Sequence, residues 1–226
     1  MFLLDTVVGR VRVAFTDRHC DLAVAADVDR VAAAFGAEPQ DVVVMRQVHG
    51  RRVVVVDTDS VPADAPTADA LVTGTPGLVL LARAADCVPV AIADPVRGLA
   101  GVVHSSRLGT QAGVVPATIE ALRAQGAGRL RAWIGPRVCG ACYEVPAAMR
   151  DEVAAAEPAT WSTTRAGTPG LDLGAGVRDQ LERAGVAVHD LADDRAACTV
   201  ESDDLFSHRR QGTGAGRLGV LAKVQP

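Results

Sequence analysis

The sequence predicts an α+β fold with mixed β-sheets in a single domain, residues 1–226. Apolar runs of strand length come in clusters, and segments with helical spacing separate these clusters. A regular βαβ winding would instead alternate one strand with one helix. The chain has 226 residues, of which 49% are hydrophobic, so it can bury one sizeable core. Because only 3% of the residues are aromatic, we expect a core of Val, Ala and Leu.

The N-terminal third is predicted to be mostly strand. Alternating or β-branched runs predict strands at 7–15, 41–45, 52–57 and 70–73. Asp27 is a suitable N-cap for a helix that runs through Phe35 and ends at Gly36. The polar, proline-bearing segment 58–68 is predicted to be a loop of the length that often overhangs a site.

The stretch from Leu78 to Thr110 is the centre of the predicted fold. It contains three apolar runs, at 78–82, 88–93 and 99–103, separated by two breaks. Because the apolar residues run continuously rather than alternating, both faces of these strands should be buried. The short connection at 94–98 predicts an antiparallel hairpin between the last two runs.

The second half is predicted to contain more helix. Apolar spacing and Gly or Pro at the ends predict helices at 110–125, 146–156 and 173–184. Strands are expected at 130–134, 186–188 and 216–224.

The composition of the chain argues against several classes of function. A net charge of −4 and a pI of about 5.7 argue against a nucleic-acid partner. No apolar stretch reaches the roughly 18 residues that span a bilayer, and the N-terminus lacks the basic start of a signal peptide. We therefore expect a cytoplasmic protein without a membrane partner, whose five cysteines are free thiols or ligands.

Three residues at the ends of predicted strands have the chemistry of a site: His49, Cys87 and His104. Thiolate and imidazole together favour zinc or copper, and three protein ligands with one open position are typical of a catalytic zinc. Asp86 could orient a ligand or accept a substrate proton. The same residues also allow a Cys87–His104 dyad of nucleophile and base, and spacing does not separate the two possibilities.

Two further segments carry reactive groups. Cys139 and Cys142 have the CxxC spacing of a redox pair or of half a zinc site, but no second CxxC accompanies them. We interpret them as two thiols in a loop. Arg209 and Arg210 precede the Gly-rich segment 211–217, where two guanidinium groups can bind a phosphate or carboxylate. The alternative is a solvated basic hairpin.

These motifs together resemble one family, over most of the chain from about Phe15 onward. The matching segments are Gln47-Val48-His49-Gly50, Ala68-Asp69-Ala70-Leu71-Val72-Thr73, Ala85-Asp86-Cys87-Val88-Pro89-Val90, Val103-His104, Ile134-Gly135-Pro136, Cys142-Tyr143-Glu144-Val145, Cys198-Thr199 and Phe206-Ser207-His208-Arg209-Arg210. The family is the multicopper polyphenol oxidase (laccase-domain) or peptidoglycan editing factor family, whose members include zinc-dependent purine nucleoside phosphorylases.

The resemblance implies a fold, an activity and a set of residues. It implies one α+β domain with sheets packed together and helices outside. His49, Cys87 and His104 match the family's zinc ligands and would be its catalytic residues. The implied reaction is phosphorolysis of adenosine, inosine or guanosine to base and ribose 1-phosphate, with adenosine deamination in some members. The residues then expected to bind substrate or phosphate are Arg18, Gln47, Asp86, Arg107, Ser207, Arg209 and Arg210.

The sequence departs from the family in two places. The family usually continues its second His as His-Ala-Gly-Trp-Arg-Gly, whereas here Leu108 stands where that Arg would be and Arg107 comes one residue earlier. Thr16-x-Arg18 matches, but the Gly-Gly-Ser and Asn-Leu segments that normally follow are missing. Three alternatives therefore stay open: a Cys87-dependent hydrolase or editing enzyme acting on peptidoglycan precursors, a non-catalytic member that keeps the fold, and a copper polyphenol oxidase. The last ranks lowest, since the chain has only five His.

Overall fold

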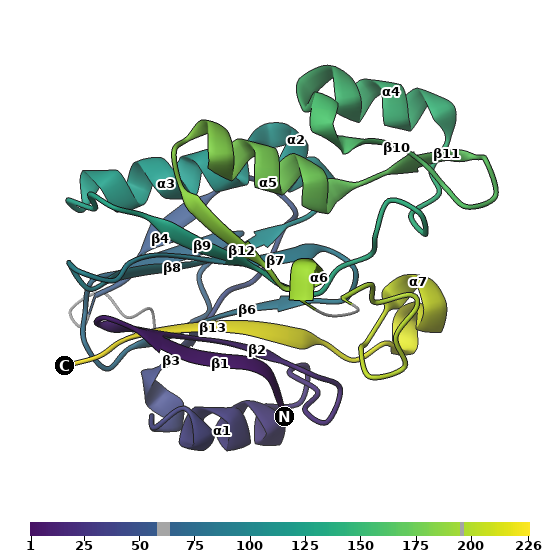
Figure 1. Cartoon of the computed structure of the whole chain (residues 1–226). Coiled ribbons are helices and arrows are strands. Elements are labelled where there is room, and N and C mark those ends of the chain that lie inside the picture. The colour runs from purple at the N-terminus through teal and green to yellow at the C-terminus, as the bar shows by residue number, and fades with distance from the viewer. Residues whose placement is uncertain (58–63, 195–196) are drawn as a thin grey trace.

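The computed structural model describes residues 1–57, 64–194 and 197–226, and these form stacked layers of sheet and helix (Figure 1). Two mixed β-sheets pack face to face, one of six strands and one of five. A group of helices covers the outer face of the six-stranded sheet, and a single helix covers the outer face of the other. The predicted α+β class with packed mixed sheets is confirmed. None of the helices in these ranges has both the length and the apolarity needed to cross a membrane.

The five-stranded sheet joins the two ends of the chain. Its order is β1 (Phe2–Val8), β2 (Val11–Thr16), β13 (Leu218–Val224), β6 (Val79–Ala84) and β3 (Val42–Val44). Neighbouring strands are antiparallel except for the parallel pair β3–β6. The single strand predicted at 7–15 is wrong, because the chain folds back at Gly9, which has a φ of +54°. A Cβ there would lie 2.5 Å from the Pro95 carbonyl oxygen, so the turn requires glycine.

The six-stranded sheet contains the predicted hairpin. Its order is β12 (Ala187–Asp190), β9 (Arg131–Ile134), β7 (Val88–Asp94), β8 (Leu99–Ser105), β5 (Ala70–Thr73) and β4 (Val53–Val55). β7 and β8 pair antiparallel from Val88–Ser105 to Asp94–Leu99, as predicted. Since β6 belongs to the other sheet, the break that contains Cys87 is the point where the chain crosses from one sheet to the other.

Most predicted helices are present, and one is divided. The α-helices are α1 (Ala25–Ala34), α2 (Arg107–Ala112), α3 (Val114–Ala124), α4 (Ala147–Ala156), α5 (Leu173–Arg183), α6 (Leu191–Asp194) and α7 (His208–Gln211), and the 3₁₀ turns are η1 (Pro39–Asp41), η2 (Pro158–Thr160) and η3 (Gly212–Gly214). The helix predicted at 110–125 is two helices, because Gly113 between them adopts a left-handed φ of 79°. The hairpin of β10 (Trp161–Thr163) and β11 (Pro169–Leu171) was not predicted. Its strands are too short to show a period.

Three apolar clusters hold the layers together. One lies between the sheets, one between the six-stranded sheet and helices α3–α5, and one between the five-stranded sheet and α1. On β5, Leu71 packs into the inter-sheet cluster while Ala70 and Val72 pack toward the helices. All residues of β7 and β8 are buried. The expectation that the continuous apolar runs are covered on both faces is therefore confirmed.

The predicted loop at 58–68 lies partly outside the described residues, since 58–63 are not described. Its described end, at Thr67 and Ala68, pairs with the chain near Arg46. The Arg46 side chain also donates to the Thr67 hydroxyl, with Nε at 3.0 Å. This contact lies two residues before the ligand turn at Val48-His49, so the segment after 63 helps to hold that turn.

Candidate metal centre

The fold brings His49, Cys87 and His104 together. His49 lies in the turn after β3, Cys87 directly precedes β7, and His104 is on β8 opposite Pro89. Their ligand atoms all lie within 4.8 Å of one another. The two imidazole rings are perpendicular, with centroids 4.9 Å apart. His104 is buried and His49 is exposed, so the group has a fixed inner side and an accessible outer side.

The backbone around two of these residues is strained. Among the described residues other than glycine, His49 and Asp86 have positive φ values, of 61° and 87°. Such conformations persist where the surroundings enforce them, and they occur often at functional sites. The bend at Asp86 lets the chain leave β6 and present Cys87 at the start of β7. Sheet crossing and ligand placement therefore use the same bend.

Asp69 holds the two histidines in place, a role that was not predicted from the sequence. Its fully buried carboxylate accepts hydrogen bonds from His104 Nδ1 (2.9 Å), the His49 amide (2.9 Å) and the Gly50 amide (2.7 Å). Because Nδ1 of His104 is engaged, Nε2 is the nitrogen left for a ligand, the usual outer support of a metal-binding histidine. One signal in the sequence points to this role: the Asp69 carboxylate stands between Ala68 and Ala70 in an apolar run, and a buried charge there requires hydrogen-bond partners.

The charges in the group let the Cys87 thiol ionise near neutral pH, whereas His104 must give up a proton there to bind a metal. Burial alone would raise the pKa of the Cys87 thiol, but hydrogen bonds and charge from His104 and His49 lower it to about 7. Burial would lower the pKa of His104, but hydrogen bonds with Asp69 and Cys87 raise it to about 9. Burial opposes ionisation of Asp69 too, yet its hydrogen bonds with His104 and Gly50 lower the pKa of the carboxyl. A thiolate, the form that binds metals, is thus available at neutral pH.

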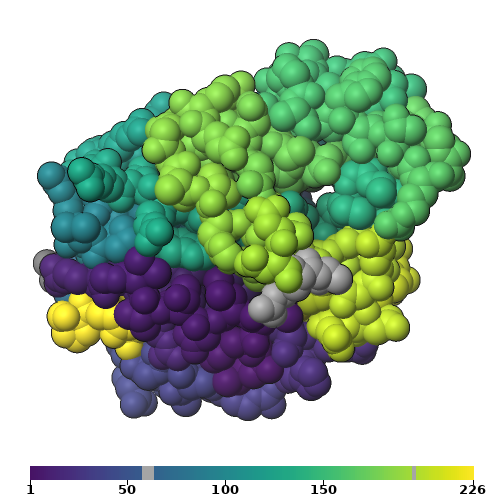
Figure 2. All heavy atoms as spheres, viewed as in Figure 1, coloured from purple at the N-terminus to yellow at the C-terminus, as the bar shows by residue number. Residues whose placement is uncertain are grey.

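A cleft of about 1170 Å³ opens over the three residues. Its lining carries several positive side chains, from Arg46, Arg83, Arg107, Arg209 and Arg217. Burial and the neighbouring charge of Arg217 both lower the pKa of Arg83, which shows that like charges crowd this wall. The cleft is therefore suited to an anion, although the whole chain is acidic. Figure 2 shows a hollow at the surface between the C-terminal segment and the segment that carries α4.

Two of the predicted substrate residues line the cleft but have both polar ends occupied by the protein. The Gln47 amide donates to the Arg83 carbonyl (2.8 Å) and accepts from the Arg83 amide (2.9 Å), which joins the ligand turn to β6. The Asp86 carboxylate accepts from the Thr199 hydroxyl (2.5 Å) and the Arg209 amide (2.6 Å). Both side chains therefore hold the walls of the cleft in position. Asp86 is occupied by Thr199 and Arg209 rather than orienting a metal ligand.

Arg107 and Arg209 both line the cleft, and the charges of both act on Tyr143. Arg107 begins α2, whose N-cap is the Ser106 side chain, and Arg209 lies on α7 with its guanidinium 4.8 Å from the Tyr143 ring centroid. Leu108 lines the cleft beside Arg107 and is 48% exposed. The segment is helical rather than extended, so neighbouring residues differ by about 100° instead of pointing to opposite faces. The shift from Leu108 to Arg107 therefore keeps a guanidinium at the cleft.

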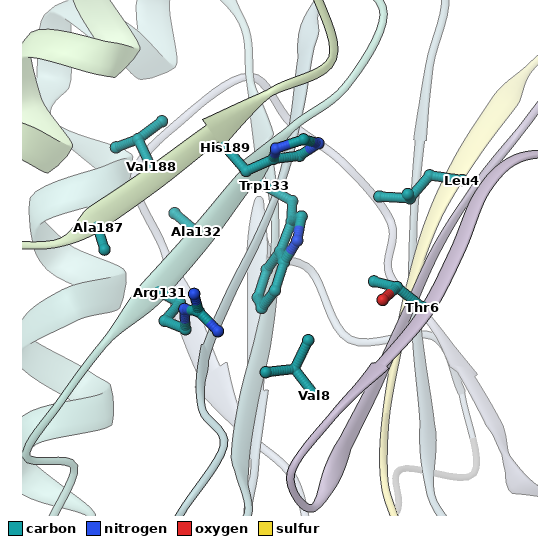
Figure 3. Close-up of a pocket in the computed structure, with 9 residues that line it drawn as sticks. All are labelled: Leu4, Thr6, Val8, Arg131, Ala132, Trp133, Ala187, Val188 and His189. Atoms are coloured by element: carbon teal, nitrogen blue, oxygen red, sulfur yellow. The ribbon is translucent and has the colours of Figure 1, made fainter. Parts of the chain in front are cut away.

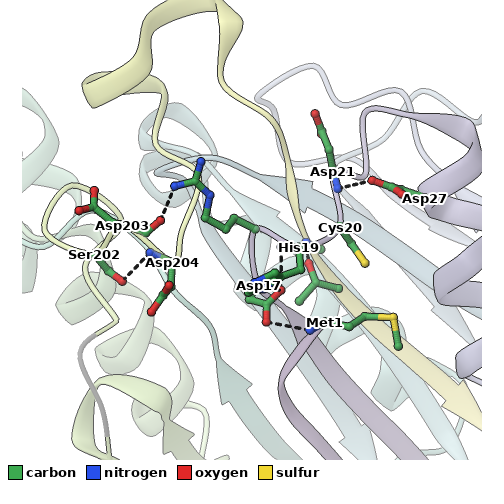
Figure 4. Close-up of polar contacts among 12 residues, drawn as sticks. Met1, Asp17, His19, Cys20, Asp21, Asp27, Ser202, Asp203 and Asp204 are labelled. Atoms are coloured by element: carbon green, nitrogen blue, oxygen red, sulfur yellow. Dashed lines mark hydrogen bonds and ion pairs between the residues drawn. The ribbon is translucent and has the colours of Figure 1, made fainter.

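Arg18, Ser207 and Arg210 are not among the described residues that line the cleft. The Arg18 guanidinium donates to the Asp203 carbonyl (2.6 Å), and the Ser207 hydroxyl caps α7 by accepting from the Arg210 amide (3.1 Å). The Arg210 guanidinium donates to the Ser202 carbonyl (2.8 Å) and pairs with Asp203. Figure 4 shows the loop with Ser202 and Asp203 beside the loop after β2. These three side chains hold the segment behind Arg209.

A second, smaller cavity of about 290 Å³ lies between β1 and the strands β9 and β12. Figure 3 shows Leu4, Thr6 and Val8 facing Trp133 and His189 across it. Among the described residues that line it there is no thiol and no carboxylate, so these residues lack the donor set of the larger cleft.

Comparison with known proteins identifies the family and the fold of the chain. Residues 11–225 match the family described as multi-copper polyphenol oxidoreductase laccase, and the chain belongs to that family. Its fold is similar to the crystal structure of the hypothetical protein YfiH of Bacillus licheniformis, with a TM-score of 0.85, 24% identity and coverage of 99% of each chain.

Relatives of the chain carry enzyme names. The chain is 51% identical over 198 residues to the purine nucleoside phosphorylase SCO2081 of Streptomyces coelicolor. This alignment covers 87% of the chain and 80% of the relative. The chain is also 32% identical over 218 residues to the adenosine deaminase RL5 of an unknown prokaryotic organism. That alignment covers 85% of the chain and 79% of the relative. These names support an enzyme that acts on small molecules.

Proposed function

We propose that the protein is a zinc-dependent purine nucleoside phosphorylase. The observation that carries the proposal is a set of two imidazoles and one thiol at the floor of an arginine-lined cleft. The floor matches the donors of a catalytic zinc with an open position. The walls match an anionic co-substrate such as phosphate. The cleft volume of about 1170 Å³ is sufficient for a nucleoside together with phosphate.

The chain's own residues bind and orient the two substrates. Arg107 and Arg209, which both line the cleft, hold the phosphate and offset its charge as one oxygen attacks C1′ of the ribose. The bond from C1′ to the purine nitrogen breaks, and its electron pair leaves with the base, which takes up a proton. The products are the free base and ribose 1-phosphate. Tyr143 lies beside Arg209 and gives the cleft an apolar wall next to these charges.

The donor set fits zinc. The ligand atoms of Cys87, His49 and His104 lie close enough to share one metal ion, and Asp69 fixes the orientation of His104 so that its Nε2 faces the other two. When bound there, zinc supplies a Lewis acid at the floor of the cleft. Within the described chain the lining contains three histidines, His49, His104 and His208, which are too few for a multicopper cluster.

The same floor supports a second reaction, the deamination of adenosine to inosine and ammonia. Zinc with histidine and cysteine ligands activates water in nucleobase deaminases. The relative named adenosine deaminase RL5 favours this activity as well. In one assay mixture with adenosine, phosphorolysis yields adenine only when phosphate is present, whereas deamination yields inosine without phosphate.

A Cys87 hydrolase would use the same thiol differently. The Cys87, His104 and Asp69 side chains form a chain of nucleophile, base and orienting carboxylate. A dyad of this kind has no need of His49, whose ring lies 4.9 Å from that of His104 on the open side. Complete activity after metal removal, abolished by alkylation of Cys87, would establish the hydrolase and refute the zinc enzyme.

The test is chromatography of the products from adenosine, inosine and guanosine, with and without phosphate and zinc. Base release that requires both phosphate and zinc supports the proposal, and no base from any nucleoside contradicts it. The Arg209→Ala variant should raise the KM for phosphate roughly 10-fold or more, as expected for one charged hydrogen bond. Arg129→Ala, at an exposed arginine outside the cleft lining, is the matched control and should leave this KM unchanged.

A further inference from the structure

A second group of metal-binding side chains lies outside the cleft lining. Three thiols and one carboxylate converge, with all ligand atoms within 4.8 Å of one another. We refer to this group as the thiol cluster; it consists of Cys139, Cys142, Cys198 and Glu201. Cys139 and Cys142 do lie in a loop, as interpreted from the sequence, but two further candidate ligands from a distant segment join them there. The missing half of the site is not a second CxxC but Cys198-x-x-Glu201, nearly sixty residues further along the chain.

The backbone presents the four ligands from two similar turns. The Cys142 amide donates to the Cys139 carbonyl (3.0 Å), and the Glu201 amide donates to the Cys198 carbonyl (3.2 Å). Each turn thus places ligands three residues apart on one side. A parallel bridge between Arg137 and Cys198 joins the two turns, with the Arg137 amide 3.0 Å from the Ala197 carbonyl oxygen.

The packing around the first turn leaves it little freedom. Gly140 lies inside it, and a Cβ there would come 2.5 Å from the Ser162 hydroxyl and 2.8 Å from Cβ of Asp172. The Cys139 amide also donates to the Cys198 sulfur (3.4 Å), a hydrogen bond typical of amides around a bound thiolate. The positions of the sulfur atoms are consequently set by the fold.

The donor set and its size fit zinc. In a tetrahedral site with zinc–sulfur bonds of about 2.3 Å, sulfur atoms lie about 3.8 Å apart. Ligand atoms already within 4.8 Å of one another need only small side-chain rotations to reach that arrangement. Three thiolates and a carboxylate would leave the zinc complex negative. Arg165 offsets part of that charge, since its guanidinium contacts the Glu201 carboxylate and donates to the Cys142 sulfur (3.4 Å).

We propose that the thiol cluster binds a second, structural zinc ion. Four protein ligands leave no open position, which is the pattern of a structural rather than a catalytic site. Each thiol gives up its proton to the solvent as it binds, and no oxidation is involved. The group of His49, Cys87 and His104, which we call the cleft centre, shares no ligand with the thiol cluster. Each group can therefore bind zinc without the other.

The second zinc would fix two walls of the cleft against each other. Tyr143 directly follows Cys142 on one turn, and Thr199 directly follows Cys198 on the other. The Thr199 hydroxyl donates to Asp86, whose other oxygen accepts from the Arg209 amide. Loss of the ion would therefore loosen the segments that carry the Tyr143 ring and the Arg209 guanidinium, without removing a ligand from the cleft centre.

The experiment is metal analysis of the full chain, purified under reducing conditions after growth with zinc. We expect two zinc ions per chain in the wild type, one in Cys142→Ser, one in Cys87→Ala and none in the double variant, since each change removes one ligand group. Cys20→Ser, at a buried thiol outside both groups, is the matched control and should keep both ions. One zinc per chain in the wild type, unchanged in Cys142→Ser, would overturn the proposal.

Three further measurements keep the test decisive. If Cys142→Ser does not fold, Glu201→Gln changes a partly exposed ligand and should release one of the two ions faster to a chelator. Cys87→Ala, which keeps only the thiol-cluster ion, gives the release rate of the unaltered cluster for comparison. Cobalt substituted into Cys87→Ala should show strong thiolate-to-cobalt absorption, as expected for three thiolates. A disulfide within the cluster in freshly reduced, zinc-loaded protein, found by mass spectrometry, would refute the zinc site. None of these three readouts depends on phosphorylase activity.

Discussion

Replacing Asp69 by Asn tests whether the carboxylate beneath the cleft organises metal binding. Oδ1 of Asp69 accepts from His104 Nδ1 and the His49 amide, and Oδ2 accepts from the Gly50 amide. An asparagine oxygen can keep the first pair, but its NH₂ group then faces the Gly50 N–H. One partly buried donor is left without an acceptor, which costs about 1 kcal/mol of folding free energy.

The same change should weaken zinc binding at the cleft. Without the carboxylate, His104 loses the charge that raises its basicity and the acceptor that fixes its tautomer. Loss of such a partner typically reduces metal affinity about 10–100-fold. This corresponds to about 1.4–2.7 kcal/mol of binding free energy. The affinity is measured by competition with a chromophoric chelator, in protein whose thiol cluster has been removed by Cys142→Ser, so that one class of site is titrated.

Asp94→Asn is a matched control for this prediction. Asp94 is buried like Asp69, and its two oxygens accept amide hydrogens from Val96, Arg97, Gly128 and Arg129, at the far end of β7. This variant should lose a similar amount of folding free energy but bind zinc as the wild type does. Equal zinc affinity in the Asp69→Asn and Asp94→Asn proteins would refute the supporting role of Asp69.

Three more predictions concern the cleft. The pKa values are about 7 for Cys87 and about 9 for His104, so zinc binding should release one proton from this pair between pH 7 and 9 and two protons below pH 7. Calorimetry in buffers of different ionisation enthalpy measures the number of protons released. A number that does not change with pH would contradict the prediction. Leu108→Arg adds a guanidinium at a half-exposed position in the cleft lining, so the KM for phosphate should fall several-fold. The folding free energy should change by less than about 0.5 kcal/mol. A higher KM for phosphate would count against the anion site. Asp86→Asn should lower kcat/KM about 10-fold by releasing the Arg209 amide while zinc content stays unchanged; lost zinc would instead make Asp86 a support of the metal.

Local sequence signals predicted most of the fold. The hairpin of β7 and β8 is visible because two uniform apolar runs flank a five-residue connection with Pro and Gly. The first hairpin was missed because Gly9 interrupts a run that otherwise alternates as one strand. The division of β6 and β7 between two sheets has no local signal. It depends on which partner strands arrive from distant parts of the chain, such as β13 beside β6.

The ligands of the cleft were easier to predict than their supports. His49, Cys87 and His104 have side chains that bind metals, and each stands at the end of an apolar run. Asp69 and the Cys198–Glu201 turn have roles only through contacts over long sequence separations, which a single sequence does not display. Arg18 and Arg210 show the converse, since their charge suggests a ligand but their guanidinium groups hold backbone carbonyls of the loop near Asp203.

The two parts of the cleft differ in how they are held, and this separates the effects of substitutions. The floor stands on strand ends fixed by Asp69, so changes there should alter metal content. The wall with Arg209 stands on a segment joined to the rest by Asp86 and, as we propose, by the thiol cluster. Changes in the wall should therefore alter phosphate KM and leave the cleft metal in place. The Asp86→Asn and Cys142→Ser variants should consequently resemble each other in kinetics, although only the second loses a zinc ion.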